Sequence, residues 1–425
     1  MRLGLHVQAD RAIDKAIDYC ARVQPEAMKW LSPSADVLAR CRQVSPRTRH
    51  IVRNVWSDQR LSRYSDFKGG TLSIVRSLLH HPALKADADG PVLWAEGFNE
   101  HVTPSTPGDH LRDFARAEAG LAKSLVDAGA GALVGGFSTG VLDAGKVGDF
   151  RAALQLCQDD PRRVALHFHE YAGAYMGLFV ETTDGKNQWE RPANRWNGYS
   201  ATREAYYAPG LTGWLTLRYR KLMPQLAASG LGNVRFAITE SGIDDTNPRP
   251  GGPNLKGWRD YAGDPQWTNG PLGDIADQWH WYLSQITRDA KRFVGVVGYG
   301  FGTIDPAWLS FDDSIEPAML ERIIGRQREI PSGAAEPSPA PTQPAPVPPP
   351  PAPPPSPGPT PLSFVVEARI QVLPGENSWL KVARRALGNP NIPVARGKEL
   401  EAANPGGLKV GAWLRSPWHK VERIN

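Results

Sequence analysis

Two glutamates follow apolar segments that could be buried strands. Glu100 closes the segment PVLWAEGFNE, and Glu240 closes the segment VRFAITE. A carboxylate at the end of a buried strand is costly to remove from water unless it is paired or used in a reaction. A functional role is therefore expected here, rather than the solvated role of a glutamate on a helix surface. Glu100 and Glu240 are the first candidates for catalytic residues.

Residues 1–330 alternate short apolar segments with longer segments of helical period, the pattern of successive βα units. Eight strands are predicted: Arg2–Val7, Ala27–Leu31, His50–Trp56, Pro91–Gly97, Gly131–Phe137, Val164–His169, Val234–Thr239 and Phe293–Gly298. This number of βα units favours a closed (β/α)8 TIM barrel. An open doubly wound sheet would usually carry a Gly-rich phosphate-binding turn after its first strand, and LGLHVQAD has none.

Helices are expected between these strands. DHLRDFARAEAGLAKSLVDAG is one such segment, which should begin just after Pro107 and end at Gly129 because proline and glycine favour those helix ends. In a (β/α)8 barrel the loops at the carboxyl ends of the strands carry the chemistry. Both glutamates would then lie at the same end of the barrel.

The segments around the two glutamates resemble clan A of the glycoside hydrolases. The resemblance is carried by Trp94, Glu96, Asn99 and Glu100 on the fourth predicted strand and by Thr239-Glu240-Ser241-Gly242 on the seventh, and it covers roughly residues 1–330. It implies that Glu100 protonates the leaving oxygen, that Glu240 attacks the anomeric carbon, and that Asn99 binds the substrate 2-hydroxyl. The configuration would be retained, with carboxyl groups about 5 to 5.5 Å apart.

Other residues could support this pair. His167, His169 and Tyr171 alternate on one face of the sixth strand. His169 and Tyr171 resemble the His-x-Tyr of clan A barrels, where the tyrosine bonds the nucleophile. Arg53, near the end of the third strand, could keep Glu240 ionised, while Glu96 is interpreted as a structural residue of the barrel.

The same histidines also allow a metal interpretation. His167 and His169 could bind zinc, but a metal site needs at least three ligands, and no complementary cluster of His, Asp or Lys follows the other strands. We therefore expect neither a metal ion nor a cofactor.

Long segments after the sixth and seventh strands are rich in aromatic residues: Trp189, Trp196, Tyr199, Trp258, Tyr261 and Trp267. Long loops are usually functional, and flat rings suit sugars, so we expect a polysaccharide cleft. Alternatively, the rings pin the loops to the barrel. The tryptophan common after the eighth strand of the family is missing, so that Phe301 or Trp308 would have to replace it.

Residues 331–361 hold 16 of the 39 prolines and a single charge, Glu336. Such a segment favours polyproline II, a semi-rigid spacer of about 3.1 Å per residue. It predicts three parts: a catalytic barrel at 1–330, a linker at 331–361 and a small module at 362–425.

The segment 362–425 resembles a LysM module, a small α+β fold. The resemblance rests on Gly375-Glu376, Trp379–Ala383, Leu400, Asn404-Pro405, and Leu408 with Gly411. It implies binding to chains that contain N-acetylglucosamine, in peptidoglycan or chitin. With 10 Lys and Arg against 5 Asp and Glu, the module has a net charge of +5, which equals that of the whole chain. This suits an anionic cell wall, although an ordinary basic surface is an equal alternative.

The sequence gives weaker information on nucleic-acid binding, membrane insertion and cellular location. No nucleic-acid motif accompanies the charge, and no apolar segment approaches the roughly 18 to 20 residues of a membrane span. The first residues lack the apolar region of a secretory signal, which leaves the cytoplasm and release by a non-classical route open. Cys20, Cys41 and Cys157 lie far apart in sequence and are predicted to pack in helices without a disulfide framework.

The leading hypothesis is a retaining hydrolase of β-linked polysaccharide that carries a carbohydrate-anchoring module. The module suggests an N-acetylated wall polymer as substrate, whereas the resemblance of the barrel suggests a β-1,4-glucan or mannan. A non-catalytic carbohydrate-binding or wall-associated protein, which keeps the barrel as a scaffold, is the alternative.

Overall fold

The structure is a computed structural model. It describes residues 1–55, 60–173, 176–177, 180–181, 210–244, 257–262, 273–303 and 306–330, and two short strands at 369–371 and 413–415. The chain divides into two compact units, Met1–Ala340 and Pro341–Asn425.

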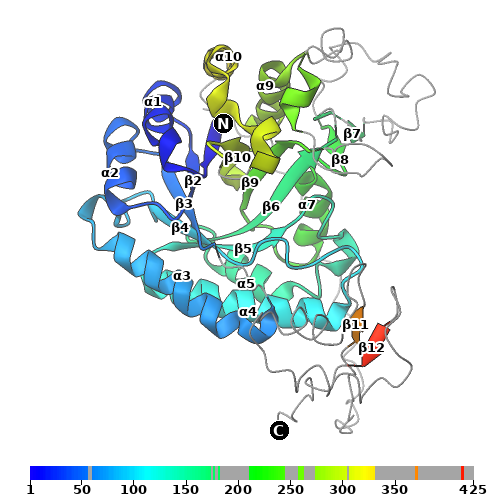
Figure 1. Ribbon diagram of the computed structural model, residues 1–425. Helices are drawn as coiled ribbons and strands as arrows, with labels where there is room; N and C mark the ends of the chain where they lie inside the picture. Colours follow the sequence, from blue (N-terminus) through cyan, green and yellow to red (C-terminus); the bar gives the residue numbers. More distant parts are fainter. Residues whose placement is uncertain are drawn as a thin grey trace, which may run out of the picture. The chain divides into compact units, whose positions relative to one another are not determined.

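The first unit contains a closed barrel of parallel strands (Figure 1). The strands are β1 (Leu3–Val7), β2 (Ala27–Leu31), β3 (Arg49–Arg53), β4 (Leu93–Glu96), β5 (Gly131–Phe137), β6 (Val164–Ala172), β9 (Phe236–Ile243) and β10 (Phe293–Phe301). Their order around the barrel is β1-β10-β9-β6-β5-β4-β3-β2, so neighbours in sequence are neighbours in space and β10 closes onto β1. All eight predicted strands and the predicted barrel are confirmed.

In the described part of the chain, one α-helix follows each barrel strand and packs outside the barrel (Figure 1). These are α1 (Ile13–Val23), α2 (Ala35–Val44), α3 (Tyr64–Leu79), α4 (Gly108–Asp127), α5 (Arg151–Asp159), α7 (Tyr219–Ala228), α9 (Ile275–Thr287) and α10 (Pro317–Arg328). Helix α4 has Pro107 as its N-cap and is followed by Gly129 at φ 92°, as predicted. None of the described helices is long and apolar enough to cross a bilayer.

Short elements complete the first unit. A two-stranded antiparallel sheet joins β7 (Val180–Glu181) to β8 (Thr212–Gly213). The short 3₁₀ helices are η1 (Asp10–Ala12), η2 (Leu61–Arg63), η3 (Pro82–Leu84), η4 (Ala144–Lys146), η6 (Trp258–Tyr261), η7 (Ala290–Arg292), η8 (Pro306–Phe311) and η9 (Asp313–Ile315).

Three strands run beyond their predicted ends, which changes the setting of the candidate residues. Strands β6 and β9 stay paired as far as Ala172 and Ile243, so Glu240 lies inside a strand and not just after it, while Tyr171 lies in the extended part of β6. Strand β10 likewise extends to Phe301. The β6–β9 register shifts between Phe168 and His169. The carboxyl ends of these strands are thus fixed by backbone pairing, which holds the side chains more rigidly than a loop would.

Small and apolar side chains from several strands fill the barrel. This inner cluster consists of Ala27, Ile51, Trp94, Leu133, Ala165, Ala237, Val294 and Val297. The indole of Trp94 lies over Gly131, where an added Cβ would come within 2.3 Å of the ring. The barrel is therefore a packed core and not a pore, and Trp94 needs a glycine on the neighbouring strand.

Two cysteines that are separated in the sequence lie close together in the fold. All three cysteines are buried in helices, as predicted. However, α1 and α2 pack against each other and bring the Sγ atoms of Cys20 and Cys41 to 3.0 Å, although both are free thiols. Their separation in sequence gave no information on this contact, which depends on how neighbouring βα units pack.

The second unit contributes one described feature. Strands β11 (Arg369–Gln371) and β12 (Trp413–Arg415) pair antiparallel, with Ile370 opposite Leu414. The motifs of the predicted LysM-like module, including Gly375-Glu376 and Asn404-Pro405, lie outside the described residues, as does the proline-rich linker.

Candidate active site

Three strands bring the two predicted glutamates to one histidine. Glu100 follows β4, Glu240 lies in β9, and His169 lies on β6 between them in the barrel order. His169 Nδ1 lies 2.7 Å from Glu100 Oε1 and 3.5 Å from Glu240 Oε2. The two carboxylate oxygens therefore lie no more than about 6 Å apart, because both are close to the same nitrogen.

The Glu240 carboxylate has further polar partners on both oxygens. Tyr171 donates its hydroxyl to Oε2 at 2.8 Å. Lys29 Nζ and Arg53 Nη1 donate to Oε1 at 2.8 and 3.0 Å. The side chain of Glu240 is only 7% exposed, so these partners replace the water that burial removes. The predicted contacts of Arg53 and Tyr171 with Glu240 are thus present.

These neighbours decide the charge of Glu240. Burial alone would raise the pKa of this carboxyl group, but the positive charges of His169, when protonated, and of Lys29 and Arg53 outweigh burial. The pKa of Glu240 is therefore held well below its usual value. The carboxylate is ionised at neutral pH, which is the form required of a nucleophile.

Lys29 is the main residue that sequence reasoning missed. Its ammonium group is fully buried and bridges Glu240 Oε1, at 2.8 Å, and Glu96 Oε2, at 2.9 Å. Glu96 is buried as well, in agreement with its interpretation as a structural residue. A usable signal exists in the sequence: a lysine interrupts the apolar strand segment AMKWL, where an unpaired charge would be costly.

His6 and Tyr299 complete the surroundings of Glu240, and neither was predicted. His6 Nδ1 lies 3.6 Å from Glu240 Oε1, and burial followed by the charge of Lys29 lowers the pKa of His6 well below its usual value. The ring of Tyr299 lies 5.4 Å from that of His6 and 5.8 Å from that of Tyr171. His6 could have been noticed in the sequence in the same way as Lys29, because it is a polar residue within the apolar strand segment LGLHV.

Glu100 has a different environment from Glu240. Its side chain is 39% exposed, and its backbone adopts φ 50°, an unusual conformation for a residue other than glycine. Glu100 N donates to Gly136 O at 2.7 Å, which holds this turn. Gly136 cannot be replaced without movement, because an added Cβ would lie 2.0 Å from Phe98 O. Backbone strain of this kind is concentrated at functional sites.

The metal interpretation finds no support in the part of the chain that the structure describes. His167 Nδ1 lies 3.1 Å from Thr239 Oγ1 and 3.8 Å from Glu96 Oε1, whereas His169 contacts Glu100. The two histidines thus have separate partners, and no group of three potential metal ligands exists among the described residues. Burial lowers the pKa of His167 to about 3, so that its imidazole is neutral.

The predicted sugar-binding aromatic residues divide into three groups. Trp308 lies close to the site, because its ring is 5.4 Å from the ring of Tyr299. Phe301, in contrast, is fully buried. Trp258 is 5% exposed and donates Nε1 to Phe311 O, which fits the alternative that it pins its loop. Trp196, Trp189, Tyr199 and Trp267 lie outside the described residues.

One cavity lies beside the ends of β1 and β2 at this side of the barrel, and none of Glu100, His169 and Glu240 lines it. This cavity of about 370 Å³ is lined by Val7 and Gln8 at the end of β1, by Trp30 and Leu31 at the end of β2, and by Ser32. Asn99, the predicted ligand of the 2-hydroxyl, precedes Glu100 and is partly exposed.

Comparison with known proteins finds distantly similar solved structures but no family. No protein-family model and no curated protein matches the sequence. A GH5-4 broad-specificity endoglucanase from Clostridium longisporum aligns over 77% of this chain and 97% of its own, at 9% identity and a TM-score of 0.43. A xyloglucan-specific GH5 endo-β-1,4-glucanase from a metagenomic library, in complex with cellotriose, aligns over 76% and 87%, at 15% identity and a TM-score of 0.40. The barrel assignment rests on the strand pairing itself.

Proposed function

We propose that the chain is a glycoside hydrolase that cleaves β-linked polysaccharide with retention of configuration. The spacing of the two carboxylates is the observation that carries this proposal. Retaining enzymes place them about 5 to 5.5 Å apart, whereas inverting enzymes leave about 6.5 to 9.5 Å for a water molecule. The contacts of His169 with Glu100 and Glu240 limit the two contacting oxygens to about 6 Å, which favours the retaining geometry.

Glu240 is proposed as the nucleophile. Tyr171, Lys29 and Arg53 fix both of its oxygens, and its depressed pKa keeps it ionised. Glu100 is proposed as the acid/base because its more exposed carboxyl group can exchange protons with substrate and water. Asn99, which precedes Glu100, is proposed to bind the 2-hydroxyl.

The reaction then proceeds in two balanced steps. In the first, an oxygen of Glu240 bonds to the anomeric carbon while the bond to the leaving oxygen breaks, and Glu100 gives that oxygen its proton. In the second, the Glu100 carboxylate takes a proton from water, whose oxygen bonds to the anomeric carbon and releases Glu240. Two inversions at the same carbon give net retention.

Two classes of polysaccharide are candidates for the substrate. The sequence around the glutamates favours a β-1,4-glucan or mannan, and the 362–425 segment, as a LysM-like module, favours a wall polymer that contains N-acetylglucosamine. We propose that this segment anchors the enzyme to such a polymer. The non-catalytic alternative requires no particular spacing of Glu100 and Glu240, so the shared contact with His169 is an argument against it.

The proposal is tested with the full chain on cellulose, xyloglucan, mannan, chitin and peptidoglycan. Release of reducing ends from at least one polymer is expected. Proton NMR of the earliest product should show the β-anomer before mutarotation. An α-anomer formed first would contradict the retaining mechanism, and no release from any β-linked polymer would overturn the enzymatic function.

A further inference from the structure

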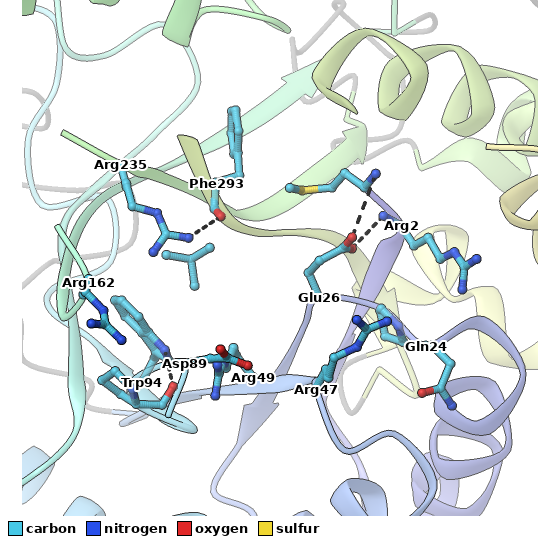
Figure 2. A pocket seen from close by; sticks show the side chains of 14 residues that line it. Arg2, Gln24, Glu26, Arg47, Arg49, Asp89, Trp94, Arg162, Arg235 and Phe293 are labelled. Atoms are coloured by element: carbon cyan, nitrogen blue, oxygen red, sulfur yellow. Dashed lines mark hydrogen bonds and ion pairs between the residues drawn. The ribbon is translucent and has the colours of Figure 1, made fainter. Parts of the chain in front are cut away.

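A second cavity lies at the opposite end of the barrel from the two glutamates. It has a volume of about 620 Å³ and is lined by residues that precede or begin the strands, such as Arg49 on β3, Arg235 before β9 and Phe293 on β10. Figure 2 shows Arg162 and Arg235 on one side of this cavity and Arg47 on another. We call it the amino-end cavity. Neither the proposed reaction nor the predicted module makes use of it.

The amino-end cavity has a clear excess of positive charge. Five arginines line it, against two acidic residues, Glu26 and Asp89. One of these arginines, Arg49, forms an ion pair with Asp87 at 3.0 Å. Arg42 contacts the same carboxylate at 2.8 Å. Two guanidinium groups thus share a single carboxylate. The balance of charge around the cavity remains positive.

Arg2, Arg162 and Arg235 donate to backbone carbonyl oxygens, Arg2 to Val23 O at 2.5 Å. Arg162 donates to Ala88 O at 2.9 Å, and Arg235 donates to Phe293 O at 2.6 Å and to Pro161 O at 3.4 Å. Arg47 is exposed. Carbonyl oxygens satisfy hydrogen bonds but do not neutralise charge. These side chains therefore keep their full charge at the edge of a concave surface.

Arg235 lies in an environment that is unfavourable for its positive charge. It is partly buried, and its Nε is buried without a hydrogen-bond partner. Burial and then the like charge of Arg49 lower its pKa. An anion in the cavity would offset the like charge of Arg49, because it would supply the opposite charge beside both guanidinium groups.

We propose that the amino-end cavity binds a compact polyanion of the phosphate class, held by Arg47, Arg49, Arg162 and Arg235. Guanidinium groups recognise phosphoryl oxygens through paired, charge-assisted hydrogen bonds. The volume lies in the range of sites for small ligands, about 300 to 1,000 Å³, and exceeds the need of a single simple ion. Several arginines on different sides of one cavity suit a ligand with more than one phosphoryl group.

The test uses the full chain and sodium tripolyphosphate, in calorimetric titrations at constant ionic strength. We expect saturable binding with one site per chain. The double variant Arg47→Ala/Arg162→Ala should weaken it at least tenfold, because both side chains are exposed and contribute mainly charge. The matched control is Arg112→Ala/Arg116→Ala, which removes two exposed arginines from the outside of α4 and should leave binding unchanged.

Other outcomes would overturn the proposal. Absence of saturable binding would show that the arginines are only solvated. Equal binding by the wild type and the Arg47/Arg162 variant would place the anion elsewhere, for example on the basic 362–425 segment. Thermal unfolding of each variant shows whether it is folded, and Arg235→Lys, which keeps the charge but loses the forked geometry, should also weaken binding if the phosphate contact is direct.

Discussion

At the carboxyl end of the barrel a buried carboxylate is surrounded by cations, whereas at the amino end arginines meet mainly backbone carbonyls. Glu240 is 7% exposed and contacts Lys29 and Arg53 directly. Arg162 and Arg235, by contrast, donate to carbonyl oxygens. Both ends of the barrel concentrate charge, but they differ in how completely that charge is compensated.

The difference follows from the cost of burying charge. A buried ion must be paired, or its burial destabilises the fold by several kcal/mol. An exposed guanidinium needs no partner, because water and salt screen it. The carboxyl end is therefore a rigid, preorganised site, while the amino end holds positive charge that a ligand can still neutralise.

The largest effect should come from removing the charge of Glu240. Glu240→Gln takes away the proposed nucleophile, and we expect kcat to fall by at least about 10³-fold. Binding of the polymer, measured by pull-down on the insoluble substrate, should persist because the surrounding contacts remain. Retention of full activity would show that Glu240 is not the nucleophile.

Replacing Glu100 should have a large effect that depends on the leaving group. Glu100→Gln cannot protonate the leaving oxygen, so cleavage of a polysaccharide should slow by about 10² to 10⁴-fold. The first step on a dinitrophenyl β-glycoside should be nearly unaffected, because dinitrophenolate leaves without a proton. A pre-steady-state burst of dinitrophenolate measures that step, and an equal loss on both substrates would argue against the acid role.

A smaller effect is expected at Lys29, and it can be read from a pH profile. Because the pKa of Glu240 is low, the acidic limb of the wild-type kcat/KM profile should lie below about pH 4.3, the usual glutamate value. Lys29→Met removes a positive charge beside Glu240, so its pKa should rise and the acidic limb should move to higher pH. A decrease in activity of about tenfold or more at acidic pH would accompany this shift.

Glu96→Gln is the matched variant for this experiment. It removes the other carboxylate that Lys29 contacts, and with it a negative charge that opposes ionisation of Glu240. The acidic limb should therefore stay in place or move to lower pH. If Lys29→Met does not fold, this opposite direction still tests the electrostatic coupling, and a shift of Glu96→Gln to higher pH would contradict it.

The smallest effect is expected at the amino end. Without a bound anion, Arg47→Gln removes one of several like charges, so the melting temperature should rise by about 1 °C at low salt. The gain should disappear near 1 M NaCl, where the screening length falls to about 3 Å. Differential scanning calorimetry at both salt concentrations checks this, and a decrease in stability would mean that Arg47 has a favourable partner.

Periodicity predicted the barrel because each strand is short, apolar and followed by a helical segment. It could not predict where β6 and β9 end, because Tyr171 and Glu240 lie in parts of the strands that are held by mutual pairing rather than by a continuous apolar run. The contact of Cys20 with Cys41 was missed for a related reason, since helix packing and not sequence distance decides it.

The sequence by itself determined the eight strands and the position of Glu100 and Glu240 at one end of the barrel, because strand order and side-chain alternation are local properties. Only the tertiary structure decided that a buried lysine joins this pair. Lys29 comes from β2, Glu96 from β4 and Glu240 from β9, and these strands converge only when the barrel closes. The arginines of the amino-end cavity lie close together for the same reason, since they come from separate βα units.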